Sequence, residues 1–128
     1  MKHLLYSSIT LILFACSYSH NQEVKIQNNS SFIFQIWSPD TTNTMVLTEE
    51  IQPGDFIMED ISAKGKAKSY LGQAPASLPF QPYNDSLSFE GKTLIKDLYV
   101  GGNWTSFLTG PNSKSIYMQF DIFDTDLQ

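Results

Sequence analysis

The chain has 128 residues and a formal net charge of −5 at pH 7, and it contains one cysteine, two histidines and no arginine. An acidic chain without guanidinium groups, which read phosphates and base edges, is a poor candidate for binding nucleic acid or anionic lipid headgroups. Any partner that is selected by charge should therefore be neutral or basic.

Residues 1–15 have the parts of an export signal. Lys2 and His3 form a polar, basic start, and an apolar run follows from Leu4 to Phe14. Eleven residues at ~1.5 Å each would span about 16 Å, roughly half of a bilayer's ~30 Å hydrocarbon core. The pattern predicts a cleaved signal peptide, since the run is too short for a transmembrane helix.

The only cysteine directly follows a small residue at the end of this run, in the sequence Leu13-Phe14-Ala15-Cys16. Leu13, Ala15 and Cys16 resemble the lipobox of bacterial lipoproteins. The resemblance implies that Cys16 receives a diacylglycerol, that a peptidase cuts just before it, and that the new amine is acylated too. Two or three acyl chains anchor a protein stably, so a membrane is an expected partner. Ser17 resembles the sorting pattern for the outer membrane, and the face, periplasmic or external, stays open.

Removing residues 1–15 from the 128 leaves 113, enough for one domain. If Cys16 carries lipid, the domain has no thiol nucleophile and no disulfide. His3 leaves with the signal, and His20 is expected in a polar tether over residues 16–22. Ser-His-Asp sites, Cys-His sites and histidine-ligated zinc all need a rigidly held imidazole. We therefore expect no catalytic residue, no cofactor and no metal.

Residues 23–128 are predicted to form one β domain. Strands over 23–28 and 31–38, separated by the turn formers Asn28-Asn29-Ser30, predict a first hairpin. Further strands are expected over 44–51, 55–61, 66–71, 87–89, 93–100, 104–108 and 115–123. The segment 66–71 reads as a lysine-lined edge strand, and 87–89 and 93–100 as a hairpin. Seven to nine short, mainly antiparallel strands indicate a β-sandwich or a partly closed barrel.

Two segments stand out among these elements. Residues 115–123 alternate most regularly, with Ile116, Met118, Phe120 and Ile122 facing one way. Residues 72–85 carry Pro75, Pro79 and Pro82, which exclude a central strand or a regular helix. We expect this second segment to be a long surface loop.

The predicted domain also resembles small Bacteroidota-type envelope lipoproteins, whose functions are mostly unknown. The matching features are Asn28 to Ser30, Pro53-Gly54, Asp85 to Phe89 with Lys92, and the closing Tyr117, Phe120, Ile122, Asp126 and Leu127. The resemblance implies an envelope location and no particular activity.

Aromatic residues near turns and in the proline-rich loop are candidate partner contacts. Phe80 and Tyr83 lie among prolines that hold the loop extended, so we expect them to be exposed. Trp37 and Trp104 are interpreted as core rings, and Trp104 is kept as an alternative contact.

Carboxylates offer weaker candidates. Asp121, Asp124 and Asp126 supply oxygen ligands that calcium prefers, but the spacing lacks the glycine and distant glutamate of a calcium loop. We interpret them as a solvated acidic tail. Glu49-Glu50 and Glu59-Asp60 are adjacent pairs whose side chains diverge on a strand, so a glycosidase site would need a second carboxylate from another strand.

Thr41 and Ser86 each follow an aspartate, in Asp-Thr-Thr and Asp-Ser-Leu. These sequences resemble the acceptor pattern of the general O-glycosylation system of Bacteroidota. A turn-initiating Asp-Ser/Thr explains them equally well. Both residues are candidate modification sites.

We therefore expect a non-enzymatic binding or assembly module, anchored in the cell envelope at the outer membrane, with an envelope protein or glycan as partner and no nucleic acid. In size and anchor it resembles the lipoproteins of type VI secretion. The alternative is an inhibitor or immunity lipoprotein whose acidic face blocks a basic enzyme or toxin. A carbohydrate-active enzyme that uses carboxylates alone is the third class.

Overall fold

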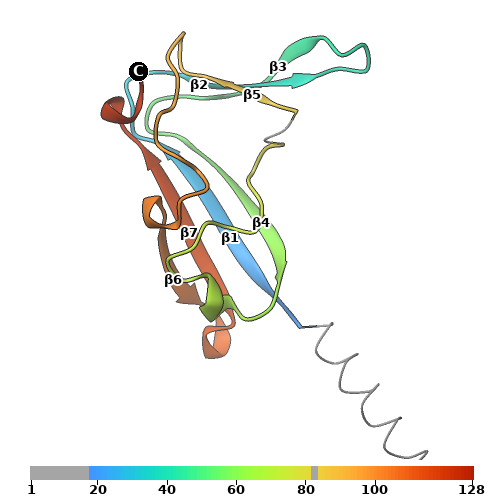
Figure 1. The fold of residues 1–128 in the computed structure, drawn as a ribbon, viewed down its shortest axis with the longest axis vertical. Helices are drawn as coiled ribbons and strands as arrows, with labels where there is room; N and C mark the ends of the chain where they lie inside the picture. Colours follow the sequence, from blue (N-terminus) through green and yellow to red (C-terminus); the bar gives the residue numbers. More distant parts are fainter. Residues whose placement is uncertain (1–17, 82–83) are drawn as a thin grey trace, which may run out of the picture.

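The computed structural model describes residues 18–81 and 84–128 (Figure 1). The predicted signal peptide, Cys16 and Tyr83 lie outside these residues. The described chain is all-β, with seven strands in two sheets that do not close into a barrel. The predicted sandwich-like fold is confirmed. No helix in the described part is long and apolar enough to cross a bilayer.

The larger sheet has the order β4-β1-β7-β6, formed by Phe56–Lys64, Ser19–Asn28, Ser115–Ile122 and Thr105–Thr109. β1 runs parallel to β7, while the other neighbours are antiparallel. Every second residue of β7 is fully buried, as the alternation predicts: Ile116, Met118, Phe120 and Ile122. Val24 and Ile26 of β1 join them, so the core lies on one face of this sheet.

The smaller sheet has the order β3-β2-β5, formed by Met45–Ile51, Phe34–Pro39 and Ser86–Ser88. Phe34 of β2 stacks on Phe89 just after β5, with ring centroids 4.7 Å apart. Figure 1 shows the hairpin of β2 and β3 extending away from the larger sheet.

Asn28 joins the two sheets where β1 ends. Its Nδ2 donates to the carbonyls of Phe32 and Ile51 at 2.8 and 2.9 Å. Its Oδ1 accepts from the amide and hydroxyl of Ser30. The side-chain amide is fully buried and uses all of its hydrogen-bonding capacity. Phe32 leads into β2 and Ile51 ends β3, so one side chain holds both legs of the hairpin.

The predicted first hairpin is wrong because β1 and β2 belong to different sheets. Both edges of β1 are occupied, by β4 and β7, so none is left for β2. The predicted tether is also wrong from Ser19 onward. The alternation of β1 starts there, with His20 and Gln22 buried, because their polar side chains find partners inside the fold.

Two other predicted strands are absent from the described chain. Residues Ala67–Tyr70 form a short 3-10 helix, η1, whose Ala67 is buried. Residues 93–100 do not pair with β5. Instead, the backbones of Thr93 and Ile95 bond to Gln128 and Asp126, and these C-terminal residues replace the expected strand partner.

We predict that Asn28→Ala lowers the free energy of unfolding by about 2–5 kcal/mol. The Ile51 carbonyl and the Ser30 amide lose the bond to this side chain, while the Phe32 carbonyl keeps the Ser30 hydroxyl as a donor. Each unpaired buried group costs about 1–3 kcal/mol. Urea denaturation measures the loss. Asn29→Ala is the matched control: its side chain is exposed and donates only to Asp121, so it should change stability by less than about 1 kcal/mol. Equal losses in the two variants would contradict the role of Asn28.

Candidate functional site

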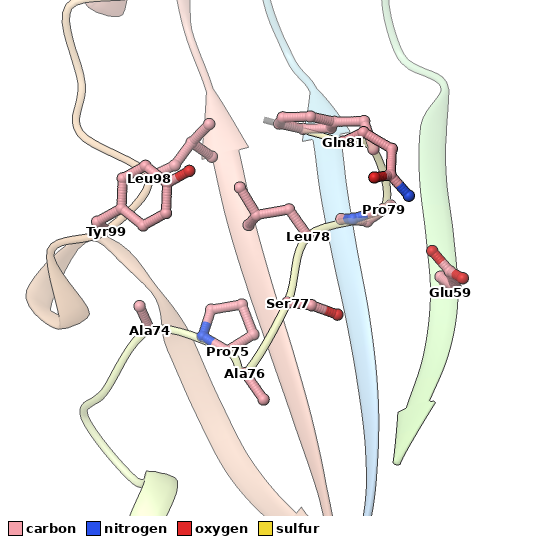
Figure 2. A pocket seen from close by; sticks show the side chains of 11 residues that line it. Glu59, Ala74, Pro75, Ala76, Ser77, Leu78, Pro79, Gln81, Leu98 and Tyr99 are labelled. Atoms are coloured by element: carbon pink, nitrogen blue, oxygen red, sulfur yellow. The ribbon is translucent and has the colours of Figure 1, made fainter. Parts of the chain in front are cut away.

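An open cleft of about 520 Å³ lies beside the segment 74–81. Figure 2 shows this segment crossing β7 and β1, with Tyr99 on one side and Glu59 of β4 on the other. Leu98 and Phe80 are also in the lining. The volume is typical of a site for a small ligand.

A series of hydrogen bonds connects His20 to Ala76, which lines the cleft. The His20 Nδ1–H donates to the carbonyl of Gly65 at 2.7 Å, which leaves Nε2 to accept from Gln22 at 3.0 Å. Gln22 Oε1 then accepts from the amide of Ala76 at 2.9 Å. The expectation of His20 in a flexible tether is wrong. Its imidazole is held rigidly, but these bonds commit both of its nitrogens to amide groups.

Glu59 is the single acidic residue among the described residues that line the cleft. It projects from the core-facing side of β4, in register with the fully buried Val24. Tyr99 is 63% exposed and presents a ring next to apolar neighbours. The cleft offers stacking and one carboxylate, a combination that suits non-covalent binding better than acid–base chemistry.

The two tryptophans, both expected to be core rings, lie in different surroundings. Trp104 is buried, with its ring 5.2 Å from that of Phe120 and its Nε1–H donating to the carbonyl of Leu98. The core interpretation of Trp104 is confirmed and its candidate role as a partner contact is wrong. Trp37, expected in the core, is partly exposed and lies outside it. Phe80 packs partly buried against the core, so it is less exposed than expected.

The three C-terminal aspartates accept hydrogen bonds from within the domain, so interpreting them as a solvated tail is incomplete. Asp124 accepts from the hydroxyl and amide of Ser31, and these bonds hold the pKa of Asp124 below its ordinary value. Asp126 accepts from the amide of Phe123, and Asp121 accepts from Asn29 and Gln119. The three are bonded separately, and the described residues contain no cluster of three or more side chains that could hold a metal.

The candidate glycosylation residues are both exposed. Thr41 lies in the turn between β2 and β3, and Ser86 begins β5. Their modification stays a prediction.

The β2–β3 hairpin forms an arm, defined here as residues 37–50. From Asp40 to Glu50 every residue is exposed, so both faces of β3 meet solvent. The apolar side chains of Met45, Val46 and Leu47 are each about 40% exposed. Cross-strand register places Leu47 opposite Trp37, and Met45 opposite Pro39. Paired residues share a face, so one face of the arm is apolar.

The arm is stiffened at both ends. At its tip, Asp40 accepts from the amides of Thr42 and Thr44 and from the Thr42 hydroxyl. At its base, the register of the two strands shifts between Ile36 and Trp37, which forms a bulge. The Thr48 hydroxyl donates to the Ile36 carbonyl at this bulge. A side chain that is fixed before binding loses less entropy on contact.

Sequence reasoning missed the arm as a candidate site. Its strand Met45–Ile51 lacks apolar–polar alternation, because neither face is buried until Ile51. The signal that could have indicated it is a three-residue apolar run beside two glutamates in a short strand.

No protein-family model matches the chain, and no curated protein or solved structure is detectably similar to it.

We predict that Asp40 titrates below its ordinary pKa of 3.8, because the Thr42 hydroxyl and then the Thr44 and Thr42 amides stabilise its ionised form. A lowered pKa in the folded state means that this stabilisation is present above the ordinary pKa and is lost as pH falls through the lowered one. NMR of the Asp40 carboxyl carbon, read with the amide shifts of Thr42 and Thr44, measures the midpoint.

Asp40→Asn keeps an acceptor oxygen and should abolish the shift of the two amides with pH. Thr42→Ala removes the strongest donor and should raise the midpoint. A wild-type midpoint at or above 3.8 would refute a carboxylate-held turn.

Proposed function

We propose that the protein is a non-enzymatic binding or assembly module of the cell envelope, anchored by acyl chains on Cys16, and that its β2–β3 arm binds a partner protein. The observation that carries the proposal is the arm: apolar residues exposed on a stiff hairpin that projects from the domain. The acyl anchor is inferred from the sequence, because Leu13 to Cys16 resemble a lipobox.

The arm has the features of a protein-binding element. Trp37, Pro39, Met45 and Leu47 give one face a continuous apolar character. Within the part of the chain that the structure describes, β3 pairs only with β2, which leaves its other edge open. A partner strand could add to that edge through backbone hydrogen bonds, while the apolar face supplies side-chain contacts.

The arm and the start of β1 lie at opposite ends of the domain. β1 begins at Ser19, only three residues after Cys16, at one end of the longest axis in Figure 1. The arm lies at the other end. An acylated Cys16 would therefore hold the domain with the arm directed away from the membrane.

An inhibitor or immunity lipoprotein is the second candidate, and the charge of the arm favours it. Residues 37–50 carry Asp40, Glu49 and Glu50 and no lysine or arginine. Such an arm is complementary to a basic enzyme, and charge complementarity speeds the encounter and excludes acidic proteins.

We predict that a photoreactive residue at position 47 of the full chain gives one discrete cross-linked product in intact cells. Position 100 is the control, because Val100 is similarly exposed, at 48% against 40% for Leu47. Met45→Asp should abolish the product, since a carboxylate on the apolar face must lose its water on binding, while Val100→Asp should leave it unchanged.

The identity of the product decides between the candidates. A small basic enzyme favours the inhibitor, and another envelope protein favours the assembly module. A product between two copies of this chain, or equal products from both positions, would overturn the role of the arm. Native protein that retains residues 1–15 and carries no acyl group on Cys16 would overturn the anchor.

A further inference from the structure

Four of the seven lysines that follow Cys16 lie at the end of the sandwich where β1 begins. We call them the lysine face: Lys64 at the end of β4, Lys66 and Lys68 around η1, and Lys114 just before β7. All four are exposed. Figure 1 shows η1 and the start of β7 at the same end as the start of β1.

No carboxylate accompanies these lysines in the sequence segments that build this end. Residues 61–84 and 98–120 contain no aspartate or glutamate, and neither do residues 1–22. The thirteen acidic residues all lie in the remaining segments, which include the arm and the C-terminus. The net charge of −5 therefore conceals a segregated distribution, with one basic end on an acidic protein.

The other three lysines are engaged within the domain. Lys25, Lys92 and Lys96 each lie within about 5 Å of the centre of an aromatic ring, and Lys96 also pairs with Asp126. Within residues 18–81 and 84–128, the lysine face has no ring contact, hydrogen bond or ion pair to its ammonium groups. These charges are free for an external anion.

Three residues of the lysine face border a recess of about 420 Å³. Lys66, Lys68 and Lys114 contribute to its lining together with polar Asn112 and Ser113. Tyr18 borders the same recess and is half exposed. An amphipathic ring beside lysines is a combination typical of membrane interfaces.

Chain geometry keeps this end close to Cys16. Tyr18 accepts a hydrogen bond from the amide of Gly65, between Lys64 and Lys66. One residue, Ser17, separates Tyr18 from Cys16, and two consecutive Cα-to-Cα steps reach at most about 7 Å. If Cys16 is acylated, this short link holds the end of the domain that carries the lysines next to the headgroup layer.

We propose that the lysine face docks on the headgroups of anionic phospholipids and fixes the orientation of the anchored domain. The inference rests on the proposed acylation of Cys16. The phosphates accept from the free ammonium groups, and each lysine near an anionic surface strengthens binding about fivefold. Acyl chains alone would let the domain tilt, whereas four charges at one end of the domain favour a single orientation.

The test uses the native lipidated protein on vesicles and measures how fast an amine-reactive reagent labels each lysine. On vesicles that contain phosphatidylglycerol, Lys64, Lys66, Lys68 and Lys114 should react about threefold or more slowly than on pure phosphatidylcholine. Lys25 and Lys92, away from this end, are internal controls and should not change. High salt should remove the protection, because it screens charges.

Equal labelling on the two kinds of vesicle would overturn the inference. The double variant Lys66→Gln with Lys68→Gln should also release Lys64 and Lys114 from protection, while Lys25→Gln should not. If inorganic phosphate on neutral vesicles protects the lysines equally, the recess is a small-anion site and the lipid proposal is overturned.

Flotation on neutral vesicles separates failure of the anchor from failure of the lysine face. Protein that does not float on phosphatidylcholine lacks its acyl anchor. In that case the lysine face must still bring the protein to phosphatidylglycerol vesicles at low salt, and absence of that binding overturns it independently.

Discussion

The geometry of the molecule depends on the hydrogen bonds of one buried amide. Asn28 is the last residue of β1. Its side chain donates to the carbonyl of Phe32, which precedes β2, and to that of Ile51, which ends β3. Its backbone also exchanges hydrogen bonds with Gly54 and Asp55, so the turn into β4 is fixed at the same point. Because an amide has two donors and one oxygen acceptor, no other side chain of similar size satisfies both carbonyls and Ser30 together. The direction of the arm relative to the larger sheet follows from this single junction.

Local patterns predicted the strands β2, β4 and β7, and in β7 the alternation also predicted which residues are buried. They failed where the partner is distant in sequence. The pairing of β1 with β7 joins residues about a hundred positions apart, and the competing hairpin of β1 with β2 is the more local choice. His20 and Gln22 look like a tether by composition, and only the carbonyl of Gly65 and the amide of Ala76 make their burial favourable.

The candidate site was difficult to predict for a related reason. Trp37 and Trp104 occupy similar sequence surroundings, yet Trp104 packs against Phe120 and donates to the carbonyl of Leu98, whereas Trp37 is partly exposed and lies outside the core. Charge was equally hidden, since an average over the chain cannot show that four lysines lie together in segments without carboxylates. These two features give the domain a direction: a basic end where the chain arrives from Cys16, and an acidic, partly apolar arm at the other end. A direction is what an anchored module needs in order to present one surface to a partner.

Energy transfer from dye-labelled headgroups to the protein tests this orientation most directly. Acylation would block the thiol of Cys16, so a dye could be attached at a single new cysteine, either Ser62→Cys near the end of β4 or Thr41→Cys at the tip of the arm. Both positions are exposed. We predict strong transfer at position 62 and weak transfer at position 41 in vesicles that contain anionic lipid. Equal transfer at the two positions, or stronger transfer at position 41, would contradict it.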